Sequence, residues 1–212
     1  MTRFLTRRSL ALGLAALPIA AQAAPTPLTP EEQALVAKAT GYLQGLGEAK
    51  SRFLQTDARG RSSQGVVYLK RPGKARFAYD PPSGLLVVSD GAFVSVADQR
   101  LKTFERYPLI STPLSLFLAK QIRLDRGVAV SRVVRFSDGF AITARDSRKS
   151  TQGEITLTFA DQPMQLLGWT ITDTRRQETR IRLAGLAPAS GLDPALFVLK
   201  DPRPVAPGRA RM

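Results

Sequence analysis

Residues 63–98 read SQGVVYLKRPGKARFAYDPPSGLLVVSDGAFVSVAD, a run of short apolar segments separated by turn residues. Alternating apolar and polar positions predict strands over residues 63–71, 74–80, 85–90 and 92–98. The joins are rich in Pro, Gly and Asp, which favour tight turns. Because tight turns join antiparallel neighbours, this stretch predicts a meander of antiparallel strands.

The same period of two continues on both sides of this stretch. Further strands are predicted over residues 49–57, 101–107, 128–136, 139–146, 153–160, 165–174 and 177–186. Two segments have helical character instead. One begins at Thr29-Pro30, where Glu32 completes a capping box with Thr29. The other follows Thr112-Pro113 and is almost wholly apolar. The sequence therefore predicts an α+β fold with one curved antiparallel sheet of about ten to eleven strands.

The first 23 residues have the features of a secretory signal. Arg3, Arg7 and Arg8 precede an apolar stretch, and Ala21-Gln22-Ala23 matches an A-x-A cleavage pattern. The Arg7-Arg8 pair fits a twin-arginine signal and equally an ordinary Sec signal, so the export route stays open. We expect residues 1–23 to be a signal peptide and residues 24–212 to form a single exported domain. No cysteine follows the apolar stretch, so no lipid anchor is expected.

The composition excludes several classes of function. The chain has no Cys and no His, which removes thiolate metal sites, cysteine nucleophiles and the commonest general base. No Gly-x-Ser-x-Gly motif and no carboxylate pair at suggestive spacing is present, so we expect no enzyme, no catalytic residue, no metal and no cofactor.

The charge balance is strongly basic. Lys and Arg number 31 against 17 Asp and Glu, a formal net charge of +14 that becomes +11 without the three arginines of the signal. Such an excess fits an anionic membrane surface, an acidic partner or simple solubility. Nucleic acid is disfavoured because an exported protein rarely meets it.

Alternation also predicts which side chains share a face of the sheet. Phe77 pairs in this way with Tyr79, and Leu86 with Val88. A curled sheet would gather such residues into a concave apolar floor beneath the helices. From the residues alone, a close-packed core and a hollow interior both remain possible.

The segment from Gln64 to Ala119 resembles the LolA family of periplasmic lipoprotein carriers. The resemblance rests on an ordered set of short motifs: Gly65-x-x-Tyr68-x-Lys70-Arg71-Pro72-Gly73-Lys74-x-Arg76-Phe77-x-Tyr79, Pro81-Pro82, Val87-Val88-Ser89-Asp90-Gly91, Pro108-Leu109 and Thr112-Pro113-Leu114. It implies an open antiparallel half-barrel with a helical lid over an apolar cavity.

The resemblance also implies a function and its partners. Family members take triacylated lipoproteins from an inner-membrane Lol ABC transporter through the periplasm to an outer-membrane LolB-type receptor. That receptor is anchored through a cysteine, which this chain lacks, so the role of a monomeric periplasmic carrier fits and the receptor role does not.

The residue roles implied by the resemblance are few. Arg71 would close the gate by reaching backbone carbonyls of the lid, a task that suits the five donors of a guanidinium. Residues expected in the hydrophobic cavity are Phe53, Leu69, Phe77, Tyr79, Leu86, Val88, Leu114 and Phe117. A carrier of another lipid or glycolipid on the same fold, and a sensor of mislocalised lipoproteins, are the alternatives.

Overall fold

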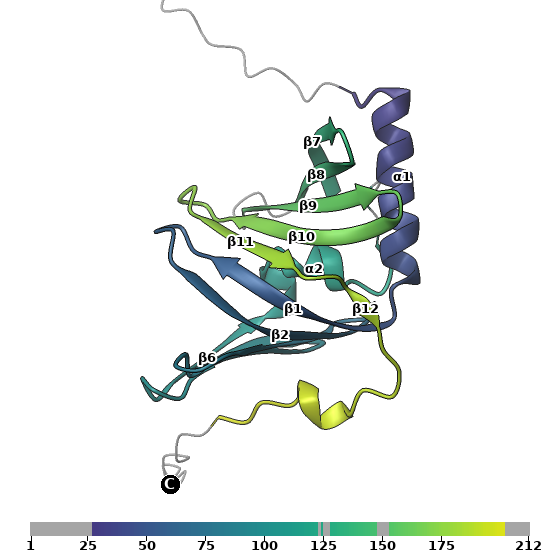
Figure 1. The fold of residues 1–212 in the computed structure, drawn as a ribbon. Helices are drawn as coiled ribbons and strands as arrows, with labels where there is room; N and C mark the ends of the chain where they lie inside the picture. Colours follow the sequence, from purple (N-terminus) through teal and green to yellow (C-terminus); the bar gives the residue numbers. More distant parts are fainter. Residues whose placement is uncertain (1–26, 123, 125–127, 148–152, 202–212) are drawn as a thin grey trace, which may run out of the picture.

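The computed structural model describes residues 27–122, 124, 128–147 and 153–201. Their fold is an open, strongly curved antiparallel sheet with two α-helices, as expected (Figure 1). The predicted signal peptide lies outside the described residues. Within the described ranges, no helix is long and apolar enough to cross a membrane.

All of the strands in the described part of the chain belong to one 12-stranded sheet. The strands are β1 (Glu48–Thr56), β2 (Ser62–Lys70), β3 (Lys74–Tyr79), β4 (Leu85–Asp90), β5 (Phe93–Asp98), β6 (Thr103–Pro108), β7 (Val128–Phe136), β8 (Gly139–Asp146), β9 (Glu154–Asp161), β10 (Met164–Thr172), β11 (Glu178–Leu183) and β12 (Ala187–Pro188). The predicted bounds of the strands agree to within a few residues, and those of β7 and β8 agree fully.

The strand order is β6-β5-β4-β3-β2-β1-β11-β10-β9-β8-β7, with β12 paired to β1. Each half of the sheet is a meander, and the pairing of β1 with β11 joins the two halves. The outer strands, β6 and β7, do not pair with each other, so the barrel stays open. This topology leaves one concave face for the helices to cover.

Helix α1 (Pro30–Gly45) begins at the predicted cap. Thr29 accepts a hydrogen bond from the backbone of Glu32, and the Glu32 carboxylate accepts one from the backbone of Thr29, which completes the capping box. The helix buries one apolar stripe, made of Leu35, Val36, Ala39 and Leu43. Lys38 on its exposed side pairs with Asp161 at the end of β9, and this ion pair ties α1 to the sheet.

The helical segment predicted after Thr112-Pro113 is short. The 3-10 helix η1 (Leu109–Ser111) precedes α2 (Leu114–Leu118), and α2 buries Phe117 and Leu118. In Figure 1, α2 lies within the curve of the sheet while α1 runs along one side. The two helices thus approach the concave face from different directions.

The opposite, convex face has a small apolar cluster of its own. The 3-10 helix η3 (Pro194–Phe197) packs over β3 and β4, and Phe197 is buried there. Arg76 in β3 donates to the carbonyl oxygen of Leu196 at 3.0 Å, which fixes this segment. Both faces of the sheet are therefore covered at β3 and β4.

Candidate functional site

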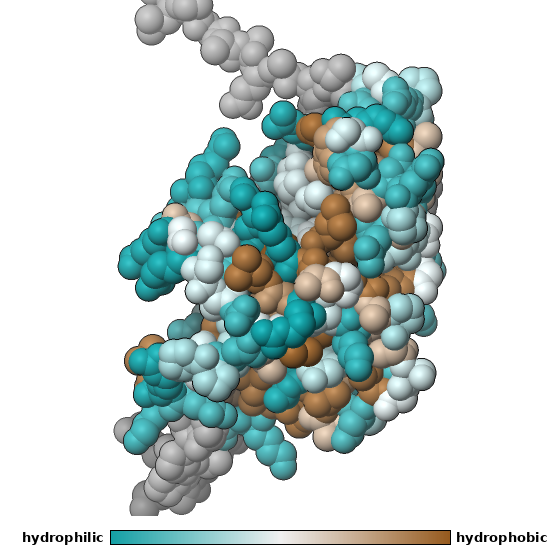
Figure 2. Space-filling view, in the orientation of Figure 1, coloured by the Kyte–Doolittle hydropathy of each residue, from teal (hydrophilic) through white to brown (hydrophobic). Residues whose placement is uncertain are grey.

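The concave face of the sheet forms the main apolar core. Strands from both halves contribute to it, together with the inward stripe of α1 and the buried side of α2. Its largest fully buried side chains include Trp169, Phe117, Phe140 and Phe159. In Figure 2, hydrophilic side chains dominate much of the visible surface, with apolar side chains exposed in patches between them.

Five aromatic side chains, which we name the aromatic cluster, fill the interior beneath α2. They are Phe53, Phe77, Tyr79, Phe117 and Trp169. The ring centroids of Phe77 and Trp169 are 6.0 Å apart, and those of Phe117 and Trp169 are 5.5 Å apart. Because Trp169 belongs to β10 and Phe77 to β3, the cluster joins the two halves of the sheet.

One polar pair lies beside these rings. The hydroxyl of Tyr79 donates to the side-chain oxygen of Gln55 at 2.6 Å. Burial raises the pKa of Tyr79 to about 12, so the phenol stays protonated and remains a donor at neutral pH. The hydrogen bond satisfies a hydroxyl that would otherwise be costly to bury.

Arg71 connects the helices over this interior. Its Nη2 donates to the carbonyl oxygen of Ala119 at 2.7 Å, and its Nη1 donates to Leu43 and, at 3.3 Å, to Leu46. These acceptors lie at the end of α1 and directly after α2. We call Arg71 and its three acceptors the clasp. The end of a helix leaves carbonyls without intrahelical partners, which suits them to accept from a guanidinium.

The clasp is partly desolvated. Burial lowers the pKa of Arg71, and its Nε is buried without a hydrogen-bond partner among the described residues. A guanidinium still carries its charge at neutral pH. Its hydrogen bonds to neutral carbonyls are therefore charge-assisted, and no carboxylate of the described chain forms an ion pair with it.

The backbone around Arg71 reinforces the clasp. The amide of Arg71 donates to Gly47 at 3.0 Å, and the amide of Gly73 donates to Leu118 at 2.8 Å. Gly73 has a φ of +78°, and a Cβ atom there would lie 2.7 Å from the Cα of Gly91. Only glycine fits this position without a shift, so the turn after Arg71 depends on it.

The structure brings most of the predicted cavity residues to one face. Phe53, Leu69, Phe77 and Phe117 are buried in the concave core, and Tyr79 and Leu114 pack against it half-buried. The exceptions are Leu86 and Val88. Phe77 is paired with Val87, which places Leu86 and Val88 on the convex face with Arg76. There Val88 is buried beside η3, so neither residue lines the interior.

Several interior residues were not predicted from the sequence. They come from the second half of the sheet: Phe140, Ile142, Ile155, Leu157, Phe159, Leu166 and Trp169. The period-two pattern of these strands would have selected most of them. Trp169, the single tryptophan of the chain, would have been the natural first choice.

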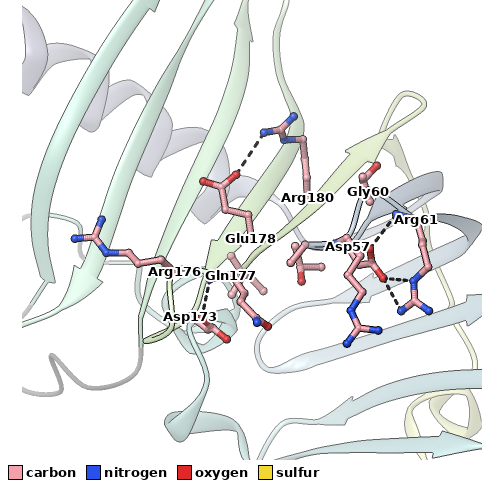
Figure 3. Close-up of a pocket in the computed structure, with 13 residues that line it drawn as sticks. Asp57, Gly60, Arg61, Asp173, Arg176, Gln177, Glu178 and Arg180 are labelled. Carbon is pink, nitrogen blue, oxygen red and sulfur yellow. Dashed lines mark hydrogen bonds and ion pairs between the residues drawn. The ribbon is translucent and has the colours of Figure 1, made fainter.

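A second feature is a polar cleft between two hairpin turns. The turn from β1 to β2 and the turn from β10 to β11 lie side by side and enclose about 850 Å³ (Figure 3). We call it the twin-turn cleft; its lining includes Arg59, Arg61, Arg176 and Arg180. Half-buried Ile171 also lines it and packs against the concave core, so the cleft borders the interior.

The described residues offer little for metal chemistry. No group of three His, Cys, Asp or Glu side chains among them is arranged to hold a metal ion. What the described residues do offer is an apolar interior, a clasp across its cover and a polar cleft beside it.

These features define a class of protein: an open antiparallel half-barrel whose apolar concave face is covered by helices held by one arginine. The family model described as outer membrane lipoprotein carrier protein LolA matches residues 44–200. The chain belongs to this LolA family, and the resemblance noted in the sequence is confirmed.

Individual relatives are distant. A Chromobacterium violaceum protein named outer-membrane lipoprotein carrier protein is 26% identical over 209 residues, covering 95% of this chain and 94% of its own length. An uncharacterized protein of Rickettsia prowazekii is 24% identical over 115 residues, 54% of each chain.

Two solved structures illustrate the structural comparison. A LolA superfamily protein from Nitrosomonas europaea has a TM-score of 0.46 and 11% identity, with 79% of this chain and 97% of that chain covered. The lipoprotein LppX of Mycobacterium tuberculosis has a TM-score of 0.43 and 14% identity, covering 77% of this chain and 99% of that one.

Proposed function

We propose that this protein is a periplasmic carrier of lipoproteins. It receives them from an inner-membrane ABC transporter, shelters their acyl chains in the concave interior and passes them to an outer-membrane receptor. Membership of the LolA family and the name of the Chromobacterium violaceum relative support this role. The observation that carries it is the clasp of Arg71, which holds two helices over an apolar interior.

The closed interior explains how an unloaded carrier stays in solution. Four of the five rings of the aromatic cluster are buried, with Trp169 2% exposed and Phe117 1% exposed, so little of this surface meets water. An acyl chain therefore needs α2 to move away first. Such a carrier has two states, and the cargo selects the open one by binding only there.

The free energies involved favour opening of the clasp by the cargo. Three charge-assisted hydrogen bonds of about 1.5–3 kcal/mol each hold the clasp, roughly 9 kcal/mol at most. Burying one sixteen-carbon acyl chain is worth about 12 kcal/mol. One chain can thus offset the whole clasp, and further chains add to the margin. The clasp is strong enough to close an empty carrier and weak enough for lipid to open it.

The proposal is tested by releasing a labelled lipoprotein from spheroplasts with purified mature protein. We expect a soluble one-to-one complex with the wild type. Arg71→Leu should alter its yield or its transfer to the receptor. The matched control is Arg76→Leu. It removes a guanidinium that lies in the same hairpin but donates to a carbonyl on the convex face. Equal behaviour of the two variants would contradict the role of the clasp.

A second candidate keeps the fold and changes the cargo. The interior is lined by apolar side chains. Such a lining discriminates acyl chains by length and number, but it does not distinguish one headgroup from another. Another lipid or a glycolipid is therefore the alternative cargo. Mass spectrometry of lipids that copurify with the protein distinguishes the two. A folded protein that yields no lipoprotein complex beside an active transporter, yet retains a lipid, would favour this candidate.

A further inference from the structure

The two turns that form the twin-turn cleft have the same construction. In the first, the Asp57 carboxylate accepts from the amides of Arg59 and Arg61, both at 2.9 Å. In the second, the Asp173 carboxylate accepts from the amides of Arg175 and Gln177, both at 2.8 Å. An aspartate that caps its own turn makes it rigid. Both turns therefore present their exposed side chains from a fixed backbone.

The two turns differ at one position that has a left-handed backbone. It is Gly60 with a φ of +77° in the first turn and Arg176 with a φ of +62° in the second. Glycine takes this conformation without strain, whereas in an arginine the Cβ atom crowds the backbone and destabilises it. Retaining a long cationic side chain where glycine would be more stable points to a use for that side chain.

The carboxylates of the cleft are already engaged. Asp57 caps its turn and pairs with Arg61 at 2.7 Å, Asp173 caps the other turn, and Glu178 pairs with Arg180 at 3.5 Å. Within the described residues, the guanidinium groups of Arg59 and Arg176 have neither an ion pair nor a hydrogen bond. Both residues are exposed. The cleft thus keeps two free cationic groups, one on each turn.

The direction of the side chains indicates what they meet. Figure 3 shows the guanidinium groups of Arg61, Arg176 and Arg180 pointing away from one another instead of converging on one point. A single anion could not reach them all. A surface with many anions could, and the turns project from the side of the sheet away from α1 (Figure 1).

We propose that the twin-turn cleft docks the protein on the anionic phospholipid headgroups of a membrane surface. Arg59 and Arg176 contact separate phosphate groups, and the rigid turns hold them apart. Because Ile171 in the cleft packs against the concave core, docking there brings the edge of the apolar interior to the lipid. Basic side chains near an anionic membrane are attracted additively, and salt weakens the attraction.

The test measures binding of the mature protein, without lipoprotein, to vesicles by sedimentation. One set contains phosphatidylglycerol and phosphatidylethanolamine, and the other only zwitterionic phosphatidylcholine. We expect binding to the first set that falls as salt is raised, and little binding to the second. The double variant Arg59→Gln, Arg176→Gly should bind the anionic vesicles about 25-fold more weakly, roughly fivefold for each arginine.

The chain offers a matched control. Lys102 also has a left-handed backbone, with a φ of +54°, and Arg100 lies beside it in the turn between β5 and β6. The double variant Arg100→Gln, Lys102→Gly removes the same charge and relieves the same kind of strain in a neighbouring turn that does not line the cleft. It should bind like the wild type.

Two results would overturn the proposal. One is equal weakening by the two double variants, which would mean that only net charge matters. The other is no binding of the folded protein to anionic vesicles at low salt. That result would also be found if the cleft binds an acidic protein instead. Lipoprotein release from spheroplasts is a separate measurement, so failure of docking does not count against the carrier function.

Discussion

The guanidinium of Arg71 and the carbonyl oxygen of Ala119 are joined by a 2.7 Å hydrogen bond, although 48 positions separate them in the chain. This bond links the turn between β2 and β3 to the residue that follows α2. It therefore acts between the wall of the half-barrel and its cover.

Arg71→Leu should loosen the cover without unfolding the sheet. The amide of Gly73 donates to Leu118, so it lies in the same contact and should lose protection when the clasp is removed. We expect much faster hydrogen exchange at Gly73 and through residues 114–119, with strands β8 to β10 unchanged. Arg76→Leu is the control. A uniform rise in exchange across the sheet would mean that Arg71 stabilises the whole fold instead.

Phe77→Ala and Val88→Ala test which face of the sheet each residue belongs to. Phe77 belongs to the aromatic cluster, and its truncation should cost about 3–5 kcal/mol of unfolding free energy. Val88 is as well buried but lies on the convex face. Its truncation should lower stability while leaving the binding of a fluorescent fatty acid unchanged. Weaker binding by Val88→Ala in a folded protein would contradict the assignment of the faces.

Glycine replacements measure the crowding at the clasp. Gly60 and Gly73 both have left-handed backbones, but a Cβ atom at Gly60 meets nothing within 4 Å. Gly60→Ala should cost about 1–2 kcal/mol from backbone strain alone. Gly73→Ala adds the clash with Gly91, worth about 1–3 kcal/mol more. Urea denaturation measures both, and equal losses would argue against the close approach.

Acid should break the ion pair between α1 and the end of β9. The hydrogen bond from Lys38 holds the pKa of the Asp161 carboxyl below its usual range. Its stabilising effect is complete above the unfolded pKa of about 3.9 and is lost as pH falls through the lower folded value. The stability difference between wild type and Asp161→Asn should therefore be constant near neutral pH and shrink in acid. A difference that grows on acidification would contradict this.

Local signals predicted the elements well. The start of α1 follows from Thr29, Pro30 and Glu32 within a few residues of each other, and all three act as expected. The meander follows from turns such as Asp90-Gly91. The pairing of β1 with β11 joins residues far apart in the chain, so no local pattern specified it.

The faces of the strands were harder to predict. Alternation correctly places Leu86 with Val88, but it cannot say which face of the sheet they share. That depends on how the turn of residues 80–84 sets the register, which pairs Phe77 with Val87. A shift of one residue exchanges the faces, and this explains why the two residues lie on the convex side.

The site itself was only partly accessible from the sequence. Arg71 was expected at the cover because of the family resemblance, whereas Leu43, Leu46 and Ala119 as its acceptors required the fold. Trp169 lies beyond the segment that carried the resemblance. The left-handed backbone of Arg176 depends on the geometry of its turn. It could not be predicted from the residue type, because arginine disfavours this conformation.

The most direct test of the carrier account uses Trp169, which contacts Phe77 and Phe117 in the interior and is the only tryptophan of the chain. A lipopeptide with brominated acyl chains, titrated into the protein, should quench the Trp169 fluorescence up to one equivalent, while the unbrominated lipopeptide should not. Binding of the brominated lipopeptide without quenching would place its acyl chains outside the interior and contradict the account.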